Sequence, residues 1–283
     1  MTIAVYPNLT RENAYEVTCN VLNELKSLGV KIVMPQEFQN DFENSGAEFL
    51  EIPDAIKLCD VIIAIGGDGT IIHAAHAVSE YDKPVLGINA GNLGFMAGLE
   101  KEELALLGSL ISGEYEIEKR MMLSAKHFEG DELISERYCF NDAVITRGGN
   151  MRLCDFEIMN AGKNPISYRA DGIIVATPTG STAYSLSAGG PVVDTTIESI
   201  ILTPICPHSL FARSLIFNSN SVLTLRVKSA DDAKTVFSCD GGEVEEITEK
   251  GRVEISKADI SAKIIRIKAD SFTDILSKKF IGR

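Results

Sequence analysis

The sequence lacks several features that would mark whole classes of protein. It contains no tryptophan and four histidines, and no apolar run approaches the length of about 20 residues that a membrane-spanning helix requires. The N-terminal stretch MTIAVYPNLT also lacks the basic start and long apolar segment of a signal peptide. We therefore expect a cytoplasmic protein that has no membrane partner.

Basic residues are scarce as well. The 27 lysines and arginines are outnumbered by 40 aspartates and glutamates, which gives a formal net charge of −13. Such a surface repels the phosphates of nucleic acids, so we expect no nucleic-acid partner. A site for a phosphorylated ligand would have to create its own local positive potential, from helix N-termini, a few arginines or a metal ion.

Patterns typical of zinc and redox sites are missing too. The six cysteines form no Cys-x-x-Cys pair, which argues against zinc ribbons and redox dithiols, and we expect buried, reduced thiols. His73 and His76 lie three residues apart on one predicted helical face, but the sequence shows no third ligand. We therefore predict no zinc site.

What the sequence does contain is an alternation of two kinds of segment over its first 119 residues. Short apolar segments at 2–7, 30–35, 60–67 and 84–89 alternate with stretches of helical spacing at 13–29, 70–81 and 101–115. The 60–67 segment is a continuous apolar strand, typical of strands buried on both faces of a parallel sheet. This alternation predicts an α/β unit with a parallel sheet.

The character of the sequence changes after residue 119. Strand-like segments joined by turns continue to about residue 268, interrupted by one helix near 181–189. The tail DSFTDILSKKFIGR returns to helical spacing, with Asp270 or Ser271 as its N-cap. We predict an α/β domain formed by residues 1–119 and 269–283 and a mainly β domain formed by residues 120–268. The C-terminal helical segment would then return to the first domain.

The stretch DVIIAIGGDGTIIH, residues 60–73, is the first that can carry chemistry. A buried strand that ends in Gly66 and Gly67 before a helix presents free backbone N–H groups, which form an anion site. It matches neither the P-loop pattern nor the dinucleotide fingerprint G-x-G-x-x-G, whose third glycine position is Ile72. Asp68 can cap the helix that starts near Thr70, and it can also hold a metal ion or accept a proton from an attacking hydroxyl. The two interpretations are compatible.

The second stretch, residues 168–193, contains a strand, the loop TPTGST and a short helix. Ser181 or Thr182 is the expected N-cap, and Gly189 follows the helix. Hydroxyl groups on one helical face can bond a ligand, although Ser/Thr-rich helix starts are also common as plain caps; these residues are Thr182, Tyr184, Ser185 and Ser187. The pattern G-x-S-x-G is absent, so we predict no nucleophilic serine.

Two shorter motifs and two arginines complete the set of candidates. The turn NAGNLGF, residues 89–95, follows a strand, and Phe95 can stack on a base or enter the core. Asn141 and Asp142 suit a sugar diol or a base edge, although Asn-Asp is also common in turns. Arg152 and Arg169 flank the polar loops, where they can pair with a phosphate or be solvated.

Taken together, these motifs resemble those of the bacterial NAD kinase family. GGDGT at 66–70 also occurs in lipid kinases, whereas TPTGSTAYSLSAGGP at 177–191 is specific to NAD kinases. The resemblance implies transfer of the ATP γ-phosphate to the 2′-hydroxyl of the adenosine ribose of NAD, with a divalent metal such as Mg²⁺. It also implies an N-terminal α/β domain, a C-terminal β domain that binds NAD, and a homodimer or homotetramer.

The resemblance assigns roles to individual residues. It makes Asp68 the catalytic base and places the ATP phosphates at the glycine loop of Gly66, Gly67, Gly69 and Thr70. It assigns no metal ligands. Asp142 stands where many members have Glu, and Gly242 where they often have Gln. The implied NAD-binding set is Asp68, Gly69, His73, Phe95, Asn141, Asp142, Arg152, Arg169, Asp171, Thr182, Ala183, Tyr184, Ser185, Leu186 and Ser187.

Two other functions fit parts of the same pattern. A lipid kinase carrying GGDGT would need an apolar pocket or a basic membrane-facing patch, which the acidic net charge disfavours. A non-catalytic protein that senses NADP would share the binding motifs, and the intact Asp68 argues against it.

Overall fold

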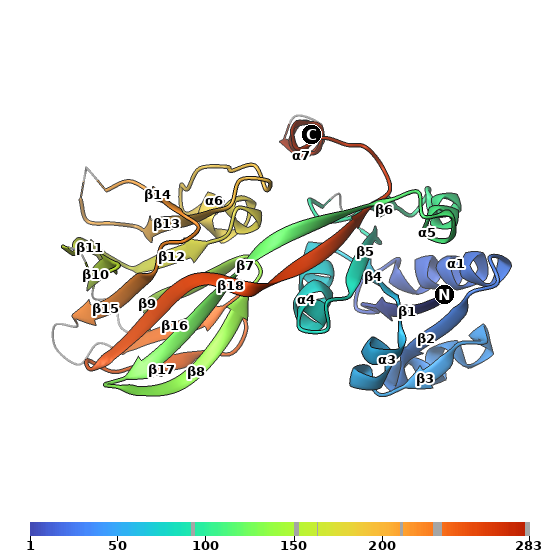
Figure 1. Ribbon diagram of the computed structural model, residues 1–283, viewed down its shortest axis with the longest axis horizontal. Coiled ribbons are helices and arrows are strands. Elements are labelled where there is room, and N and C mark those ends of the chain that lie inside the picture. Colours follow the sequence, from blue (N-terminus) through green and yellow to red (C-terminus); the bar gives the residue numbers. More distant parts are fainter. Residues whose placement is uncertain (92–93, 150–152, 163, 210–211, 229–233, 281–283) are drawn as a thin grey trace. The chain divides into compact units, whose positions relative to one another are not determined.

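The computed structural model describes residues 1–91, 94–149, 153–162, 164–209, 212–228 and 234–280 (Figure 1). The chain divides into two compact units. Unit 1 contains Met1–Lys119 and Ser261–Arg283, and unit 2 contains Arg120–Ile260. Of the helices in these described stretches, none has the length and apolar character needed to cross a membrane.

Unit 1 is built on a parallel sheet, as its alternating sequence predicts. Its strand order is β3 (Glu48–Leu50), β2 (Lys31–Pro35), β1 (Thr2–Pro7), β4 (Val61–Gly66) and β5 (Pro84–Asn89), with the end of β18 (Gly251–Arg266) beside β5. The two-residue strand β6 (Leu99–Glu100) also pairs with β5. All these pairings are parallel.

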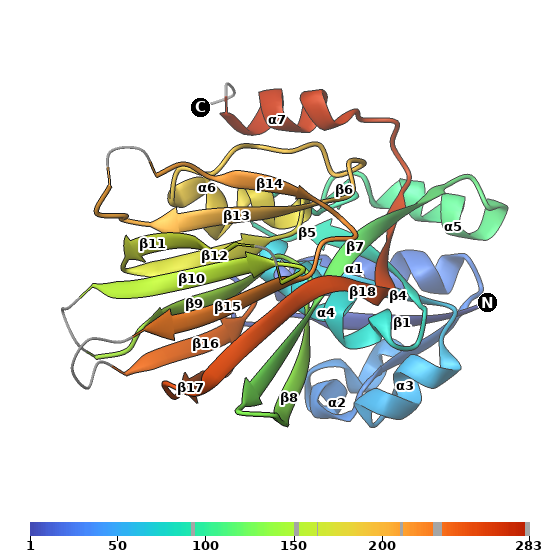
Figure 2. The same cartoon turned by 60° about the vertical axis from the view of Figure 1, so that its left-hand side comes forward.

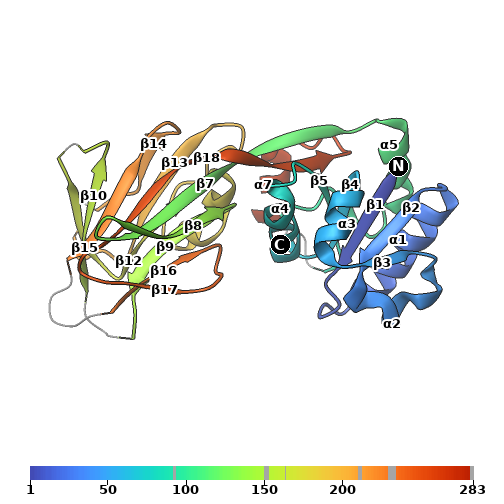
Figure 3. The ribbon, with the colours of Figure 1, turned by 60° about the horizontal axis from the view of Figure 1, so that its bottom comes forward.

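Helices cover both faces of this sheet because alternate strand residues point to opposite sides. Ile3 and Val5 pack in one core with α1 (Ala14–Ser27) and α5 (Gly108–Ser112). Ala4 and Ile62 line the other face. Helices α3 (Ile52–Leu58) and α4 (Asp68–Ser79) cover that face (Figure 3). The remaining short helices of the unit are η1 (Gln36–Phe38), α2 (Gln39–Phe42), η2 (Glu43–Ser45) and η3 (Leu104–Leu107).

Unit 2 is mainly β. One antiparallel sheet has the order β14 (Leu215–Asn218), β13 (Ser199–Ile205), β12 (Gly172–Ala176), β9 (Asp142–Arg147), β16 (Thr235–Cys239) and β17 (Glu245–Ile247). Beside it lie β11 (Ile166–Ala170), β10 (Cys154–Asn160), β15 (Leu223–Lys228) and β18, together with the hairpin of β7 (Glu116–Glu129) and β8 (Glu132–Cys139) (Figure 2). The only helical segments among its described residues are η4 (Thr179–Thr182) and α6 (Tyr184–Ser187).

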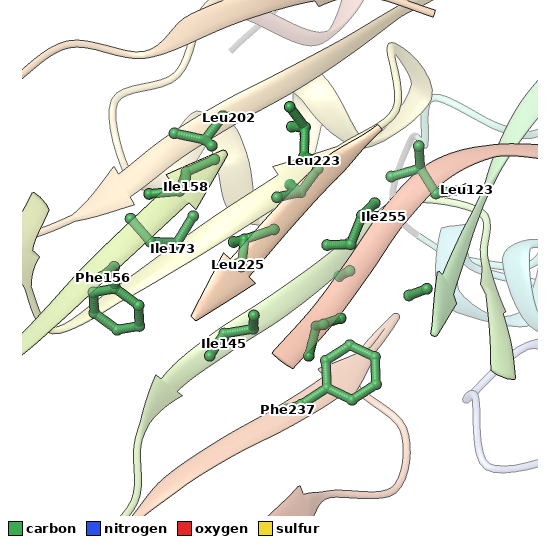
Figure 4. Close-up of a cluster of buried hydrophobic side chains, with 14 of the residues drawn as sticks. Leu123, Ile145, Phe156, Ile158, Ile173, Leu202, Leu223, Leu225, Phe237 and Ile255 are labelled. Atoms are coloured by element: carbon green, nitrogen blue, oxygen red, sulfur yellow. The ribbon is translucent and has the colours of Figure 1, made fainter. Parts of the chain in front are cut away.

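The core of unit 2 lies between these strands. Fully buried side chains from both sheets meet in one apolar cluster, which includes Phe156, Phe237, Ile173 and Leu225 (Figure 4). The cluster draws every second residue of strands such as β15, whose sequence LTLRVK alternates buried and outward-facing side chains. The mainly β character of residues 120–268 agrees with the strand-like segments that their sequence predicted.

Several predicted elements differ from the structure. The helix expected over 101–115 is two short pieces, η3 and α5, and the strands β3, β11, β13 and β14 were not predicted. The N-cap predicted at Ser181 or Thr182 is wrong, because a 3₁₀ turn occupies these positions and Ala183 precedes α6. All six cysteines are free, but Cys206 is exposed and Cys19 is half-buried, so the expectation of buried thiols fails at these two.

The C-terminal helix was predicted correctly. α7 spans Phe272–Phe280 (Figure 2). It belongs to unit 1. Ser271 caps it, because its hydroxyl accepts the Asp274 N–H at 3.2 Å while the Asp274 carboxylate accepts the Ser271 N–H at 2.9 Å. This reciprocal pair is a capping box, with Asp in place of the usual Glu.

Candidate active site

Asp68 lies at the edge of the unit 1 sheet where strands β1, β4 and β5 end. β4 ends at Gly66 and α4 begins at Asp68. β1 pairs with β2 on one side and β4 on the other, so the strand order reverses here. Ligands of open α/β sheets bind at the carboxyl ends of the strands at such a reversal.

The Asp68 carboxylate does not cap α4. Gly67 is the N-cap residue, and the start of the helix has no capping hydrogen bond from a side chain. The two carboxylate oxygens instead accept the backbone N–H groups of Phe95 at 2.9 Å and Met96 at 3.0 Å. The capping interpretation is therefore wrong, because the helix begins at Asp68 itself and the carboxylate satisfies the loop that follows β5.

Glycines make this arrangement possible. A Cβ on Gly94 would overlap the Asp68 carboxylate, and a Cβ on Gly66 would overlap the Thr70 side chain. Gly69 is exposed at the first turn of α4, where backbone N–H groups point out of the helix. Gly94 therefore lets the loop after β5 approach the Asp68 carboxylate, and Gly66 lets the end of β4 approach Thr70.

Asn8 and Arg11, which follow β1, support this loop, and sequence reasoning missed both. The Asn8 side-chain amide donates to the Thr70 hydroxyl at 3.0 Å, and the Asn8 N–H donates to the Ile65 carbonyl at 2.9 Å. The Arg11 guanidinium lies 4.0 Å from the position that a Cβ on Gly67 would occupy. A polar run directly after the first strand was the signal that could have identified them, because that strand ends at the same edge.

A cation from the far end of the chain also reaches Asp68. The Lys279 Nζ lies 3.4 Å from Asp68 Oδ2 and 4.2 Å from the centroid of the Phe95 ring. Phe95 is half-buried, so it enters the core only partly, and its ring contacts the Lys279 ammonium group. No spacing in the sequence indicates this contact.

His73 lines an apolar groove whose lining does not include Asp68. It is exposed on α4, and the groove is also lined by side chains such as Ala4 and Ile56. Asn92 and Leu93, in the predicted NAGNLGF turn, lie outside the described residues. Across the part of the chain that the structure describes, no group of three His, Cys, Asp or Glu side chains could hold a metal ion.

In unit 2 the structure brings three distant stretches together at Asn141 and Asp142. The Asp240 carboxylate accepts the backbone N–H groups of Phe140, Asn141 and Asp142 at 2.6, 2.7 and 2.9 Å. The Thr177 N–H donates to the Asn141 carbonyl at 2.8 Å. The predicted polar loop 177–182 therefore lies beside the predicted Asn-Asp pair, and Asp240 fixes the backbone of that pair.

Asp142 is an unusual acid. It is 5% exposed. Burial, and to a smaller extent the nearby Asp240 carboxylate, together raise the pKa of its carboxyl to about 7. Near neutral pH the group therefore interconverts between an acceptor-only carboxylate and an acid that can donate a hydrogen bond.

The hydroxyl groups of the 182–187 segment do not all face outward as expected. Ser185 is fully buried, and its hydroxyl shares a 3.0 Å hydrogen bond with Thr203. Tyr184 and Ser187 are exposed, whereas Thr182, Ala183 and Leu186 are half-buried. In the single turn of α6, the Ser185 side chain packs against strand β13. The residues on either side of Ser185 remain accessible to a ligand.

The remaining candidates lie elsewhere. Asp171 precedes β12, whereas Asn141 lies beside the other end of that strand. Its carboxylate pairs with the Arg147 guanidinium at 3.0 Å. Arg169 is exposed, with Asp155 at 4.0 Å, and Arg152 lies outside the described residues.

Sequence comparison identifies the family of both halves of the chain. Residues 2–115 match the ATP-NAD kinase N-terminal domain, and residues 140–267 match the ATP-NAD kinase C-terminal domain. The chain belongs to the ATP-NAD kinase family. The resemblance drawn from the motifs is thereby confirmed.

Relatives in this family match over most or all of their length. The NAD kinase of Caldanaerobacter subterraneus subsp. tengcongensis is 37% identical over 284 residues, which cover 99% of each chain. The NAD kinase of Symbiobacterium thermophilum is 41% identical over 225 residues, which cover 79% of each chain.

Two solved structures share the fold. Yeast NADH kinase in complex with NADH has a TM-score of 0.90 at 23% identity, covering 100% of this chain and 87% of the other. An NAD kinase from Archaeoglobus fulgidus in complex with ATP has a TM-score of 0.74 at 22% identity, covering 100% and 98%. The predicted fold class, a parallel α/β domain followed by a mainly β domain, is confirmed.

Proposed function

We propose that this protein is an NAD kinase, which transfers the γ-phosphate of ATP to the 2′-hydroxyl of the adenosine ribose of NAD and forms NADP and ADP. The observation that carries this conclusion is the match to both family domains, together with 37% identity to an NAD kinase over nearly the full length. Phosphoryl transfer depends mainly on positioning and charge neutralisation.

Asp68 is the proposed general base. Its carboxylate is fixed by two backbone N–H groups and stands at the start of α4, next to the glycine loop. A carboxylate offers about four lone-pair positions, so acceptor capacity remains for a ribose hydroxyl. Accepting the proton of that hydroxyl would make it a better nucleophile toward the phosphoryl group.

The glycine loop is the proposed phosphate site for ATP. Gly66, Gly67, Gly69 and Thr70 surround the N-terminus of a 12-residue helix, whose free N–H groups and dipole favour an anion. Arg11 adds positive charge beside Gly67. These local features offset the acidic character of the whole molecule.

Residues 120–268 form the proposed NAD-binding domain, and residues 1–119 with 269–283 form the proposed nucleotide-binding domain. Asn141 and Asp142 are the central pair of the NAD site, supported by Asp240 and the 177–182 loop. The exposed or half-buried residues Thr182, Ala183, Tyr184, Leu186 and Ser187 complete its contacts. Gly69, His73, Phe95, Arg152, Arg169 and Asp171 belong to the same proposed set, whereas Ser185 supports its neighbours from inside.

We propose that the reaction requires Mg²⁺. This ion is usually held by one or two carboxylates together with substrate phosphates, and not by a protein cage. Asp68 is the carboxylate that stands beside the glycine loop, and the described residues offer no cluster of three ligands, which suits an ion that arrives with ATP. The ion would neutralise charge on the phosphates during transfer.

Two further properties follow from the family alone. We propose that the protein is a cytoplasmic enzyme and that it assembles as a homodimer or homotetramer. Light scattering of the purified protein distinguishes these assemblies from a monomer.

One assay tests the proposed function. Purified protein is incubated with ATP, Mg²⁺ and NAD, and NADP is measured with an NADP-specific dehydrogenase. NADP should accumulate in proportion to enzyme concentration, and none above a protein-free control would contradict the proposal. Parallel reactions with diacylglycerol or sphingosine test a lipid kinase, and NADP binding without turnover would indicate a sensor.

A further inference from the structure

The C-terminal helix α7 brings a lysine to the proposed catalytic base. The Lys279 Nζ lies 3.4 Å from Asp68 Oδ2 and 4.2 Å from the Phe95 ring centroid. The two charged side chains are similarly enclosed, with 25% of Lys279 and 28% of Asp68 exposed. The Phe95 N–H also donates to Asp68 Oδ2, so the ring and the carboxylate together define where the ammonium lies.

Local hydrogen bonds and an ion pair stabilise α7 independently of this contact. The capping box of Ser271 and Asp274 starts the helix, and Lys278 pairs with Asp270 at 2.9 and 3.0 Å. Lys278 and Lys279 are adjacent, but their partners differ. Lys278 pairs with Asp270, which directly precedes α7, whereas Lys279 contacts Asp68 next to the glycine loop. The chain therefore directs only one of these two ammonium groups to Asp68.

Charge gives this lysine a role next to Asp68, in addition to that of Arg11 beside Gly67. A carboxylate beside an ATP phosphate repels it, in a molecule with a net charge of −13. Lys279 has three N–H donors, of which one faces Asp68. Two donors remain for phosphate oxygens, so the ammonium can bridge the base and the phosphoryl group.

The position of Asp68 indicates which phosphate is contacted. If Asp68 accepts the proton of the 2′-hydroxyl, the phosphoryl group under attack must lie next to that hydroxyl. A cation 3.4 Å from Asp68 is then close to the γ-phosphate. Charge on its oxygens must be neutralised during transfer.

We propose that Lys279 is a catalytic residue that binds the γ-phosphate of ATP, with α7 acting as the element that delivers it. This inference rests on the proposed NAD kinase function. Lys279 attracts the γ-phosphate toward Asp68, and the Phe95 ring holds the ammonium between them by a cation–π contact. The C-terminal segment is therefore part of the active site and not only a structural extension.

The test compares substitutions at the two neighbouring lysines. Lys279→Met keeps the stem and removes the charge, and Lys278→Met is the matched control on the same helix. We expect Lys279→Met to lower kcat by about 10²-fold, as the loss of one preorganised transition-state donor does. The KM for NAD should stay within about threefold because uniform binding of NAD is not changed. Lys278→Met should stay near the parent, and Lys279→Arg should restore part of the rate.

A binding measurement separates this inference from the proposed function. Calorimetry compares ADP with a non-hydrolysable ATP analogue that carries a β,γ-imido bridge. The parent should prefer the analogue, and Lys279→Met should lose that preference while it still binds ADP, whether or not the parent forms NADP. Retained preference, or equal kcat in both lysine variants, would overturn the role of Lys279. Absence of NADP in the parent would overturn the kinase function alone.

Discussion

At the scale of single residues, the proposed chemistry depends on how one carboxylate is held. Asp68 accepts two backbone N–H groups from the loop after β5 and has Lys279 at 3.4 Å. These contacts fix the orientation of the carboxylate before substrate binds. A base that is already oriented needs no reorganisation during proton transfer.

Removal of this carboxylate should abolish most turnover and leave the fold intact. We expect Asp68→Asn to lower kcat by about 10²–10⁴-fold, because an amide cannot act as a general base. NAD affinity should change little, whereas the thermal midpoint should fall by a few degrees, because the amide NH₂ faces one of the two backbone N–H groups that the carboxylate accepts. Steady-state kinetics and calorimetry measure this, with exposed Asp54→Asn as the control. A rate within a few-fold of the parent would refute the base assignment.

The position of the carboxylate can be tested without changing Asp68. A Cβ on Gly94 would overlap the Asp68 carboxylate, whereas a Cβ on Gly91, in the same loop, meets open space. We expect Gly94→Ala to lower kcat by about 10²-fold, since small displacements of a catalytic group have effects of that size. Gly91→Ala should keep its activity. Equal kcat in the two variants would show that the loop does not position the base.

Asp142 should make stability depend on pH. Its pKa is raised from 3.8 to about 7, so the folded protein holds a proton that the unfolded chain has lost over this interval. The bound proton therefore stabilises the folded state in acid, and this contribution to the free energy of unfolding is lost as the pH rises through about 7. We therefore expect the difference in free energy of unfolding between Asp142→Asn and the parent to shift in favour of the variant by about 2–4 kcal/mol as the pH rises from 5 to 8.

Urea unfolding at several pH values measures this difference. The control is Asp131→Asn, an exposed acid in the same unit, which should run parallel to the parent at every pH. If the difference between Asp142→Asn and the parent is the same at pH 5 and 8, Asp142 does not titrate as burial implies.

At the scale of elements, long apolar segments were predictable and short ones were not. The strands β1, β4 and β5 were found because continuous apolar runs between helical stretches are typical of a parallel sheet. β13 was missed although it is apolar, since Pro204 lies within it. β14 pairs only with Ser199–Leu202, so Pro204 lies beyond that pairing, where its missing N–H is tolerated.

The burial of Ser185 could not be predicted for a related reason. A helix of one turn has no periodicity that distinguishes its inner face from its outer face. The Ser185 hydroxyl shares a hydrogen bond with Thr203, which lies on β13, a strand that the sequence did not indicate. Propensity therefore located the polar loop but not the direction of each side chain.

The cap of α7 should control how well Lys279 is delivered. α7 has nine residues and would be marginal without its capping box. We expect Ser271→Ala to destabilise this helix by about 1 kcal/mol and to speed hydrogen exchange of its amides. The value of kcat should fall with it, toward that of Lys279→Met. Ser277→Ala, an exposed position on the same helix, is the control. Unchanged exchange in Ser271→Ala would contradict this role of the cap.

At the scale of the whole molecule, the motifs identified the family and distant contacts completed the sites. GGDGT and the 177–191 run were visible in the sequence and led to the function. Lys279 and Asp68 are separated by 211 residues, and Asp240 lies 98 residues from Asp142. No local pattern connects such pairs, because only the folded topology brings them together.

The measurement that tests the central claim most directly is ³¹P NMR of the complete reaction. Protein, ATP, Mg²⁺ and NAD are incubated, and a parallel sample contains EDTA. We predict a new phosphomonoester resonance that titrates with a pKa of about 6 and couples to the ribose H2′ proton, in an amount equal to the ADP formed and absent with EDTA. Release of inorganic phosphate with no new phosphomonoester would contradict the assignment as an NAD kinase.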